Sequence, residues 1–430
     1  MTLPMALERA QHSPRDPNVL NNVGVLSRAQ GHAAVAEVWL RRAVSLAPHV
    51  AAYHSNLGNA LRDLGRYGEA VDHLTQATAL DPGSSRFAYN LALAVRDLGR
   101  WDEAVEMLES LARSHPEDSE IEWDLALSRL ADGDFARGFR GYEARLRLDR
   151  FPSRPLAGVR WMGGDLTGKT LFVRAEQGFG DMLQFVRFIP ELVGRGARVI
   201  LESDPSLAPL FAEIEGVAQV VPRQPAGEAA EVRLPGYDLW VPMGSLPHLL
   251  EIDAPALERQ RFPYLKTSRH LTAPLPRPRG ARLAVGLVWA GKIRPRDRSW
   301  PLASLLPLLH DPDVAYYSLQ IGPRAADLGR LGANGLIMDV GSGLKSFADT
   351  AAVMADLDLM ISIDSAPVHL AGALGVPTFV LLRNVADWRW GRRGERTPWY
   401  PSVELFRQRD ADDFDGPVRA IAARLKDLVA

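Results

Sequence analysis

Apolar residues in the first third of the chain recur with the period of an α-helix. Within residues 51–84, Leu57, Leu61 and Leu74 are spaced as the buried positions of two successive helices. Gly65 separates these helices, where a helix commonly ends in a left-handed residue. The pattern therefore predicts a pair of helices joined by a short turn.

This helix pair belongs to a repeat with a period of 34 residues. The period is marked by glycines at the turn and prolines after the second helix: Gly31, Gly65, Gly99, Gly133, Pro48, Pro82 and Pro116. The pattern resembles the tetratricopeptide repeat, whose antiparallel helix pairs stack into a solenoid. We expect a repeat domain at residues 1–150, with repeats at 17–50, 51–84, 85–118 and 119–150.

The first helix of each repeat lines the concave face of such a solenoid, where a partner protein would bind. Three Asn residues occupy the same place in successive repeats: Asn22, Asn56 and Asn90. A carboxamide offers both a donor and an acceptor, so it can bind a peptide backbone. An ordinary polar helix face would have the same pattern, and both interpretations stay open.

From Leu171 onward, short apolar runs alternate with helical segments. Residues 170–176 and 197–203 are strand-like, and the stretch between them is helical. A Pro-rich, basic stretch at residues 262–279 has the composition of a linker, and a second alternating series follows it. Such alternation predicts parallel sheets covered by helices. The fold class is therefore α + α/β, with a solenoid followed by two Rossmann-like domains at residues 160–265 and 279–430.

Composition narrows the function classes. The net charge is −2, which gives no reason to expect a nucleic-acid partner. The chain has no cysteine, which excludes disulfides and thiolate metal sites. No apolar run approaches the ~20 residues of a membrane span, and the first residues lack the pattern of a secretory signal. We therefore expect a cytoplasmic protein with no membrane span.

A Gly-containing loop with one acidic residue follows the first strand of the second half. The loop contains Gln177, Gly178, Gly180 and Asp181, and it opens the next helix. The glycines allow a tight turn and the close approach of a ligand. Asp181 then lies in the first helical turn and faces the cleft between the domains. The alternative is a helix cap, because Asp is favoured at helix N-termini for its hydrogen bonds and its charge alone.

A later junction between a strand and a helix carries residues suited to a nucleotide sugar: Asp364, Ser365, Ala366 and His369. Backbone N–H groups at residues 365–368 would point into the cleft and form an anion site for a diphosphate. Asp364 is placed to accept hydrogen bonds from sugar hydroxyls. Alternatively, Asp364 or Ser365 only caps the helix, and His369 is a buried histidine whose hydrogen bonds are satisfied.

Two other loops carry candidate residues. Lys292 and Arg298 follow the first strand of the second series, where basic side chains can neutralise phosphate charge or form a solvated loop. Trp388 is one of three tryptophans in a polar stretch at residues 387–400. These suggest an aromatic floor or a domain-closing loop, with core packing as the alternative.

Residues 165–410 resemble the heptosyltransferase-like glycosyltransferases of family 9, in the branch with N-terminal tetratricopeptide repeats. Residues 364–375 resemble the family's D-[ST]-G-x-x-H-L-x-x-A-L-G motif, with Ala366 in place of the usual Gly. The Gly180-Asp181 pair resembles the family's first-domain G-D pair, whose Asp is the proposed general base. Arg298 falls where the family often has a basic residue that contacts donor phosphate.

The resemblance implies a two-domain GT-B fold and metal-independent, inverting transfer from a nucleotide sugar. Under it Asp181 is the catalytic base. The residues assigned to the donor are Lys292, Arg298, Asp364, Ser365, Ala366 and His369. Those assigned to the acceptor side and its loops are Gln177, Gly178, Gly180 and Trp388.

No cofactor is expected, because the nucleotide sugar is a substrate, and no metal is expected, because no D-x-D lies in a convincing loop position to hold one. The repeats suggest a protein acceptor, since small acceptors need no such surface, and some bacterial relatives with this architecture modify flagellins. Two alternatives are a non-catalytic scaffold with a degenerate GT-B module and a lipopolysaccharide or polysaccharide glycosyltransferase.

Overall fold

The computed structural model describes residues 1–151, 156–223, 234–267, 271, 274–292 and 297–429. Its backbone contacts divide the chain into two compact units, Met1–Arg129 and Leu130–Ala430. None of the helices in the described part of the chain is long and apolar enough to cross a membrane.

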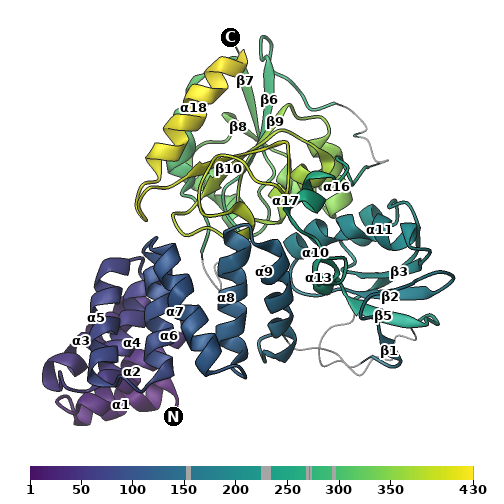
Figure 1. Ribbon diagram of the computed structural model, residues 1–430. Helices are drawn as coiled ribbons and strands as arrows, with labels where there is room; N and C mark the ends of the chain where they lie inside the picture. Colours follow the sequence, from purple (N-terminus) through teal and green to yellow (C-terminus); the bar gives the residue numbers. More distant parts are fainter. Residues whose placement is uncertain (152–155, 224–233, 268–270, 272–273, 293–296, 430) are drawn as a thin grey trace. The chain divides into compact units, whose positions relative to one another are not determined.

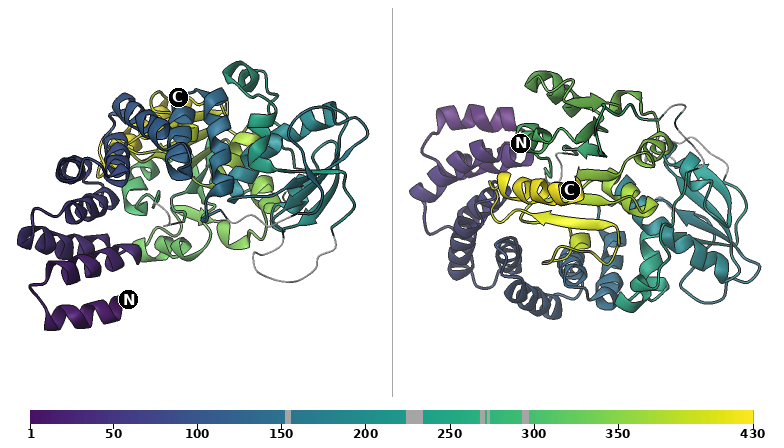
Figure 2. Two further views of the ribbon diagram at one scale, coloured as in Figure 1. Left: turned by 60° about the horizontal axis from the view of Figure 1, so that its bottom comes forward. Right: turned by 90° about the horizontal axis from the view of Figure 1, so that it is seen from above.

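The first unit is a row of antiparallel helix pairs (Figure 1; Figure 2). Its elements are α1 (Leu3–His12), α2 (Pro17–Ala29), α3 (Ala33–Leu46), α4 (Ala51–Asp63), α5 (Tyr67–Leu80), α6 (Ser85–Asp97), α7 (Trp101–Ser114) and most of α8 (Ser119–Ala131). Helices α2, α4, α6 and α8 begin at the first residue of the predicted repeats. Gly65 has a φ of 76°, as expected for the turn after α4. A Cβ atom at Gly58 would lie 2.6 Å from Leu74, so only glycine lets α4 and α5 pack this closely.

The second unit begins with α9 (Phe135–Tyr142) and the 3-10 turn η1 (Glu143–Arg147), followed by a five-stranded parallel sheet. The strand order is β1-β5-β2-β3-β4. The strands are β1 (Val159–Arg160), β2 (Thr170–Arg174), β3 (Arg198–Ser203), β4 (Val217–Pro222) and β5 (Leu239–Pro242). The helical elements of this layer are α10 (Phe179–Phe185), η2 (Val186–Phe188), α11 (Ile189–Gly194), α12 (Ala208–Phe211), η3 (Met243–Ser245), α13 (Leu246–Leu249) and α14 (Ala254–Glu258).

A six-stranded parallel sheet follows, with the order β11-β10-β9-β6-β7-β8. Its strands are β6 (Leu283–Val288), β7 (Val314–Ser318), β8 (Ile337–Asp339), β9 (Leu359–Ile363), β10 (Thr378–Leu382) and β11 (Val403–Arg407). The helical elements are η4 (Leu302–His310), η5 (Pro323–Ala326), α15 (Asp327–Leu331), η6 (Gly341–Gly343), α16 (Phe347–Met354), α17 (Ala366–Leu374), η7 (Trp388–Trp390) and α18 (Asp415–Val429). Helix α18 packs beside this sheet (Figure 1), and its Ile421 and Leu425 belong to a core that also contains Leu287 and Ile361.

These elements confirm the predicted fold class, a helical solenoid followed by two parallel α/β sheets of the GT-B kind. The domain limits near residues 150, 160, 265 and 279 stay predictions. One difference concerns the first helix of the second alternating series, which the sequence predicts at residues 299–310: it is a 3-10 helix at residues 302–310 that contains Pro307. Another is that the helix expected over residues 182–196 is divided into α10, η2 and α11, with Pro190 in the first turn of α11.

Candidate functional site

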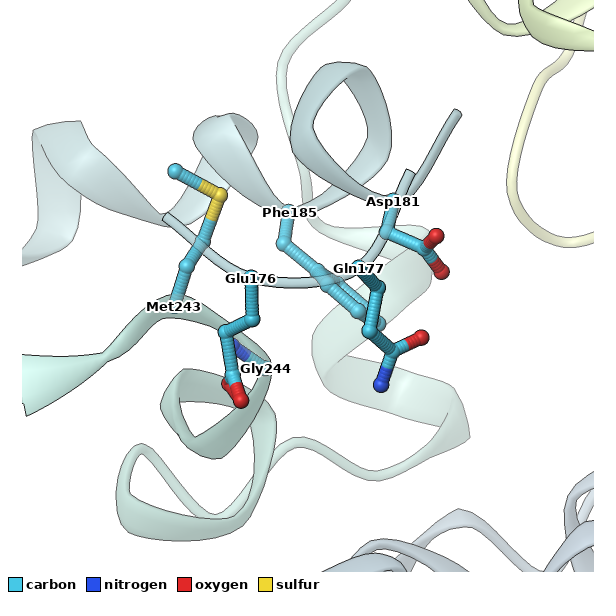
Figure 3. Close-up of a pocket in the computed structure, with 6 residues that line it drawn as sticks. All are labelled: Glu176, Gln177, Asp181, Phe185, Met243 and Gly244. Atoms are coloured by element: carbon cyan, nitrogen blue, oxygen red, sulfur yellow. The ribbon is translucent and has the colours of Figure 1, made fainter. Parts of the chain in front are cut away.

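Each of the two parallel sheets reverses its strand order at one point. Ligands of open α/β sheets bind at such a point, beyond the carboxyl ends of the strands. In the first sheet the reversal lies between β2 and β5. The residues after these strands line a small hollow together with α10: Glu176, Gln177, Asp181, Phe185, Met243 and Gly244. Figure 3 shows Asp181, Gln177 and Phe185 at one side of the hollow, and Glu176, Met243 and Gly244 at the other. The topology therefore places the predicted loop at the position where a ligand is expected.

In the second sheet the reversal lies between β6 and β9. The loop after β6 carries Lys292 and Arg298, and the junction after β9 carries Asp364 and Ser365. Gln320 fixes the first of these loops, since its Oε1 accepts the N–H groups of Trp289 at 3.1 Å and Ala290 at 2.8 Å. The two segments predicted to bind the donor thus flank the second reversal point.

The two reversal points meet where α10 packs against α17. A Cβ atom at Gly180 would lie 2.8 Å from Cδ2 of His369, so the absence of a side chain at Gly180 permits the contact. Gly180 precedes Asp181, and His369 lies in the first half of α17. Glycine is required here for close packing between the two α/β layers.

Asp181 has a partner on each carboxylate oxygen. Its Oδ2 accepts the N–H of Gly178 at 2.9 Å, which is the capping contact considered from the sequence. Its Oδ1 accepts a hydrogen bond from Nη2 of Arg389 and forms an ion pair with it. The side chain is 20% exposed, so a third group can still reach the carboxylate. Capping and a reactive role are therefore compatible at this residue.

Arg389 is the main residue of this region that the sequence analysis did not select. The guanidinium also bonds Oδ1 of Asp387 at 2.8 Å and Oε1 of Gln184, and it lies 4.3 Å from the ring centroid of Trp388. Burial would lower the pKa of Arg389, but the carboxylates of Asp387 and Asp181 outweigh it and raise the pKa. The signal in the sequence that could have found it is a charged residue between two tryptophans, Trp388 and Trp390. An arginine buried among such rings needs carboxylate partners, so this pattern predicts an ion pair.

The predicted donor residues Arg298 and Asp364 form an ion pair of 2.8 Å. Burial raises the pKa of Asp364; Arg298 opposes this rise, and Asp387 adds to it. The Arg298 side chain is 36% exposed, so its remaining N–H groups can reach a phosphate. Lys292 is exposed and lies beside residues 293–296, which fall outside the described part of the chain.

His369 is buried, as the alternative interpretation expected. Its Nδ1 is 2.8 Å from the hydroxyl of Tyr400, and its ring stacks on Trp390 with centroids 5.4 Å apart. Burial lowers the pKa of His369 well below its ordinary value, and the charges of Arg389, Arg298 and Arg187 lower it further. The imidazole is therefore neutral at pH 7, and its direct contact with a donor stays a prediction.

The anion site at the start of α17 is smaller than the sequence analysis expected. Pro367 has no N–H, and the N–H of Val368 donates to the carbonyl of Ser365 at 3.1 Å. The expectation of free N–H groups throughout residues 365–368 is therefore wrong. Within the described ranges, the amides of this stretch that donate to no backbone carbonyl are those of Ser365 and Ala366.

Trp388 packs in the core of this unit. It is 6% exposed and makes edge contacts with Phe139, Tyr142 and Trp399, at centroid distances of 5.6–6.1 Å. The structure matches the core-packing alternative for this residue.

The Asn residues of the repeats have different surroundings. Asn56 donates from Nδ2 to Oδ1 of Asn21 at 2.8 Å, and Asn90 donates to Oγ of Ser55 at 3.1 Å. Asn22 is exposed. The first two side chains therefore connect neighbouring repeats, and a partner-binding role for the three stays a prediction.

No group of three or more His, Cys, Asp or Glu side chains within the described ranges is arranged to hold a metal ion.

Comparison with known proteins finds two family models that match parts of this chain. Residues 61–130 match the tetratricopeptide repeat, and residues 342–413 match glycosyltransferase family 9 (heptosyltransferase). The chain is 32% identical over 326 residues to Protein FlbA of Caulobacter vibrioides, a match that covers 70% of this chain and 54% of FlbA. The chain thus spans about half the length of this curated relative.

Among solved structures, MamA is 21% identical with a TM-score of 0.30, over 34% of this chain and 85% of MamA. YrrB, described as a TPR protein with an unusual peptide-binding site, is 16% identical with a TM-score of 0.28, over 34% of this chain and 75% of YrrB. The two family matches fall on the solenoid and on the second parallel sheet. The chain is therefore similar to the tetratricopeptide repeat over residues 61–130 and to glycosyltransferase family 9 over residues 342–413.

Proposed function

We propose that this chain is an inverting, metal-independent glycosyltransferase that transfers a sugar from a nucleotide sugar to a protein acceptor bound by the repeats. One observation carries the proposal. The carboxylate of Asp181 lies at one reversal point, the basic and N-terminal helix groups lie at the other, and α10 and α17 bring them together. The family 9 match over residues 342–413 supports the same chemistry.

In the proposed reaction Asp181 accepts the proton of the acceptor hydroxyl. The acceptor oxygen attacks the anomeric carbon, the bond from that carbon to the phosphate oxygen breaks, and the nucleoside diphosphate leaves. A carboxylate oxygen can accept more than one hydrogen bond. Asp181 can therefore accept a hydrogen bond from the acceptor hydroxyl while it keeps its hydrogen bond from Gly178 and its ion pair with Arg389. General-base catalysis of this kind requires the base within hydrogen-bond reach of the proton.

The departing diphosphate would be stabilised by Arg298, Lys292 and the N–H groups at the start of α17. Fixed cationic and N–H groups aimed at developing negative charge are a strong source of rate acceleration. Asp364 holds Arg298 in place in this arrangement.

The first test is calorimetric binding of a panel of nucleotides and nucleotide sugars to the wild type and to Arg298→Ala. We expect one nucleotide class to bind, and the substitution to weaken it by about tenfold to a hundredfold, because a charge-assisted bond to phosphate is lost. Arg277→Ala is the matched control. Arg277 pairs with Asp358 at 2.9 Å just before β9, at the amino ends of the strands and away from the candidate site at their carboxyl ends. No binding by any nucleotide would favour the non-catalytic scaffold.

The second test concerns the acceptor. A fragment of residues 130–430, which corresponds to the second compact unit, is expected to bind the donor as the full chain does. Its kcat/KM for a protein acceptor should fall by about a hundredfold or more, because recruitment by the repeats raises the local acceptor concentration. An equal kcat/KM for both proteins would remove the recruitment role and favour a polysaccharide or lipopolysaccharide acceptor.

A further inference from the structure

We propose that Tyr142 and Arg145, at the end of the last predicted repeat, are positioning residues for the loop that carries Asp181. The inference deepens the proposed function and rests on it. Both residues lie at the junction of α9 and η1, and each contacts one residue of the loop after β2: Tyr142 contacts Gln177, and Arg145 contacts Glu176.

Gln177 has a backbone conformation that needs support from its surroundings. Its φ is 57°, in the left-handed region that costs free energy for a residue with a Cβ atom. Its Nε2 is buried and finds no hydrogen-bond partner among the residues that the structure describes. Two unfavourable features at one residue beside a candidate base are typical of a functional site whose geometry is imposed by neighbours.

Tyr142 provides one of these supports. Its hydroxyl donates to Oε1 of Gln177 at 3.0 Å. The ring is 1% exposed and makes edge contacts with Phe185 and Trp388, at centroid distances of 6.4 and 6.1 Å. Phe185 lies on α10 and Trp388 lies next to Arg389 in η7. Because the ring is packed between these two elements, its hydroxyl has a fixed position. It therefore fixes the Gln177 side chain relative to both α/β layers.

Arg145 provides a second support, three residues further along the chain. Its side chain is fully buried, and its Nη2 donates to Oε2 of Glu176 at 2.6 Å and to Oγ of Ser245 at 2.8 Å. Its Nη1 bonds Oε1 of Glu143 at 2.7 Å. One guanidinium thus holds the segments that follow β2 and β5.

Glu176 completes this connection, because its Oε2 also accepts the N–H of Gly244 at 3.0 Å. A Cβ atom at Gly244 would lie 2.9 Å from the same oxygen, so a side chain at this position would displace the carboxylate. Glu176 is therefore joined directly to Gly244, and through Arg145 to Ser245, so the segments after β2 and β5 are held together at this side of the hollow (Figure 3).

The consequence concerns the position of the candidate base. Gln177 precedes Gly178, whose N–H is bonded to Asp181, so a shift of Gln177 moves the carboxylate that the reaction uses. Reacting groups must be held within fractions of an ångström, and small displacements caused by remote substitutions reduce the rate. Helix α9 and the turn after it therefore help to hold the candidate base in its reactive position.

The test uses Tyr142→Phe in the full chain, which removes only the hydroxyl. We expect kcat to fall about tenfold while the donor KM is unchanged, because the base loop is misplaced and the donor site is intact. Hydrogen exchange at the amides of residues 176–184 should become faster. Tyr316→Phe is the matched control, since Tyr316 is also buried and donates its hydroxyl to the carbonyl of Leu308 at 2.6 Å, within the core of the second sheet.

A second variant separates positioning from stability. Gln177→Gly removes the contact with Tyr142 but accepts a positive φ without strain, so the melting temperature should stay equal or rise while kcat falls. A merely structural contact would give the opposite result, a lower melting temperature with unchanged kcat. Unchanged kcat and unchanged exchange in Tyr142→Phe would overturn the inference. If the wild type transfers no sugar, the proposed function fails, and the exchange measurement alone decides whether Tyr142 orders the loop.

Discussion

The Asp181→Asn variant is expected to lose sugar transfer by about a hundredfold to ten-thousandfold, the range that general-base catalysis contributes. The amide oxygen can still accept the N–H of Gly178, so the start of α10 should keep its cap. The neutral side chain cannot take the proton of an acceptor hydroxyl. The measurement is single-turnover transfer at saturating donor, together with donor affinity, which should change little by comparison, and melting temperature, which reports the loss of the charge that pairs with Arg389.

The control for this variant is Asp387→Asn. Asp387 and Asp181 are the two carboxylates on Arg389, so both substitutions remove one of its charged partners. Only Asp181 lines the hollow at the first reversal point. Equal losses of activity in the two variants would mean that Asp181 acts through Arg389, and its assignment as the base would be wrong.

The fold could be predicted from the sequence wherever a local pattern was strong. The starts of α2, α4, α6 and α8 agree with the repeat period because each repeat buries the same small and apolar positions against its neighbour. The buried strands β2, β6 and β9 were visible as apolar runs. The short edge strands β1 and β8 were not predicted, since two or three residues carry no measurable period.

The candidate site could be predicted only in part, because its contacts join residues far apart in the chain. Asp181 and Arg298 were selected from local motifs and a family resemblance. The partner of Asp181 is Arg389, 208 residues later, and only the packing of the two α/β layers brings them together. Tyr142 lies in the last predicted repeat, where the sequence analysis expected structural residues, and its contact with Gln177 follows from where α9 ends.

The Arg389→Gln variant is expected to lose about 3–5 kcal/mol of folding free energy, the usual cost when one partner of a buried ion pair is removed. Arg389 is 7% exposed and bonds Asp181, Asp387 and Gln184, so the substitution leaves two carboxylates near the buried Trp388 without their counter-charge. Such a loss should lower the melting temperature by about 10 °C in a unit of this size. Arg389→Lys should recover only part of the lost stability, because a lysine ammonium cannot reproduce the planar guanidinium that bonds three groups at once.

The matched control is Arg407→Gln, at the end of β11. Arg407 also contacts the segment at residues 387–400, but it donates its hydrogen bonds to the backbone carbonyls of Gly394 and Trp390. Burial lowers the pKa of Arg407 to about 10, with no carboxylate among the causes of the shift. Removing its charge leaves no carboxylate unpaired, so the melting temperature should fall less than in Arg389→Gln. Equal falls in thermal denaturation would show that the carboxylates of Asp181 and Asp387 do not depend on Arg389, and the ion pair would then have no part in holding the two α/β layers together.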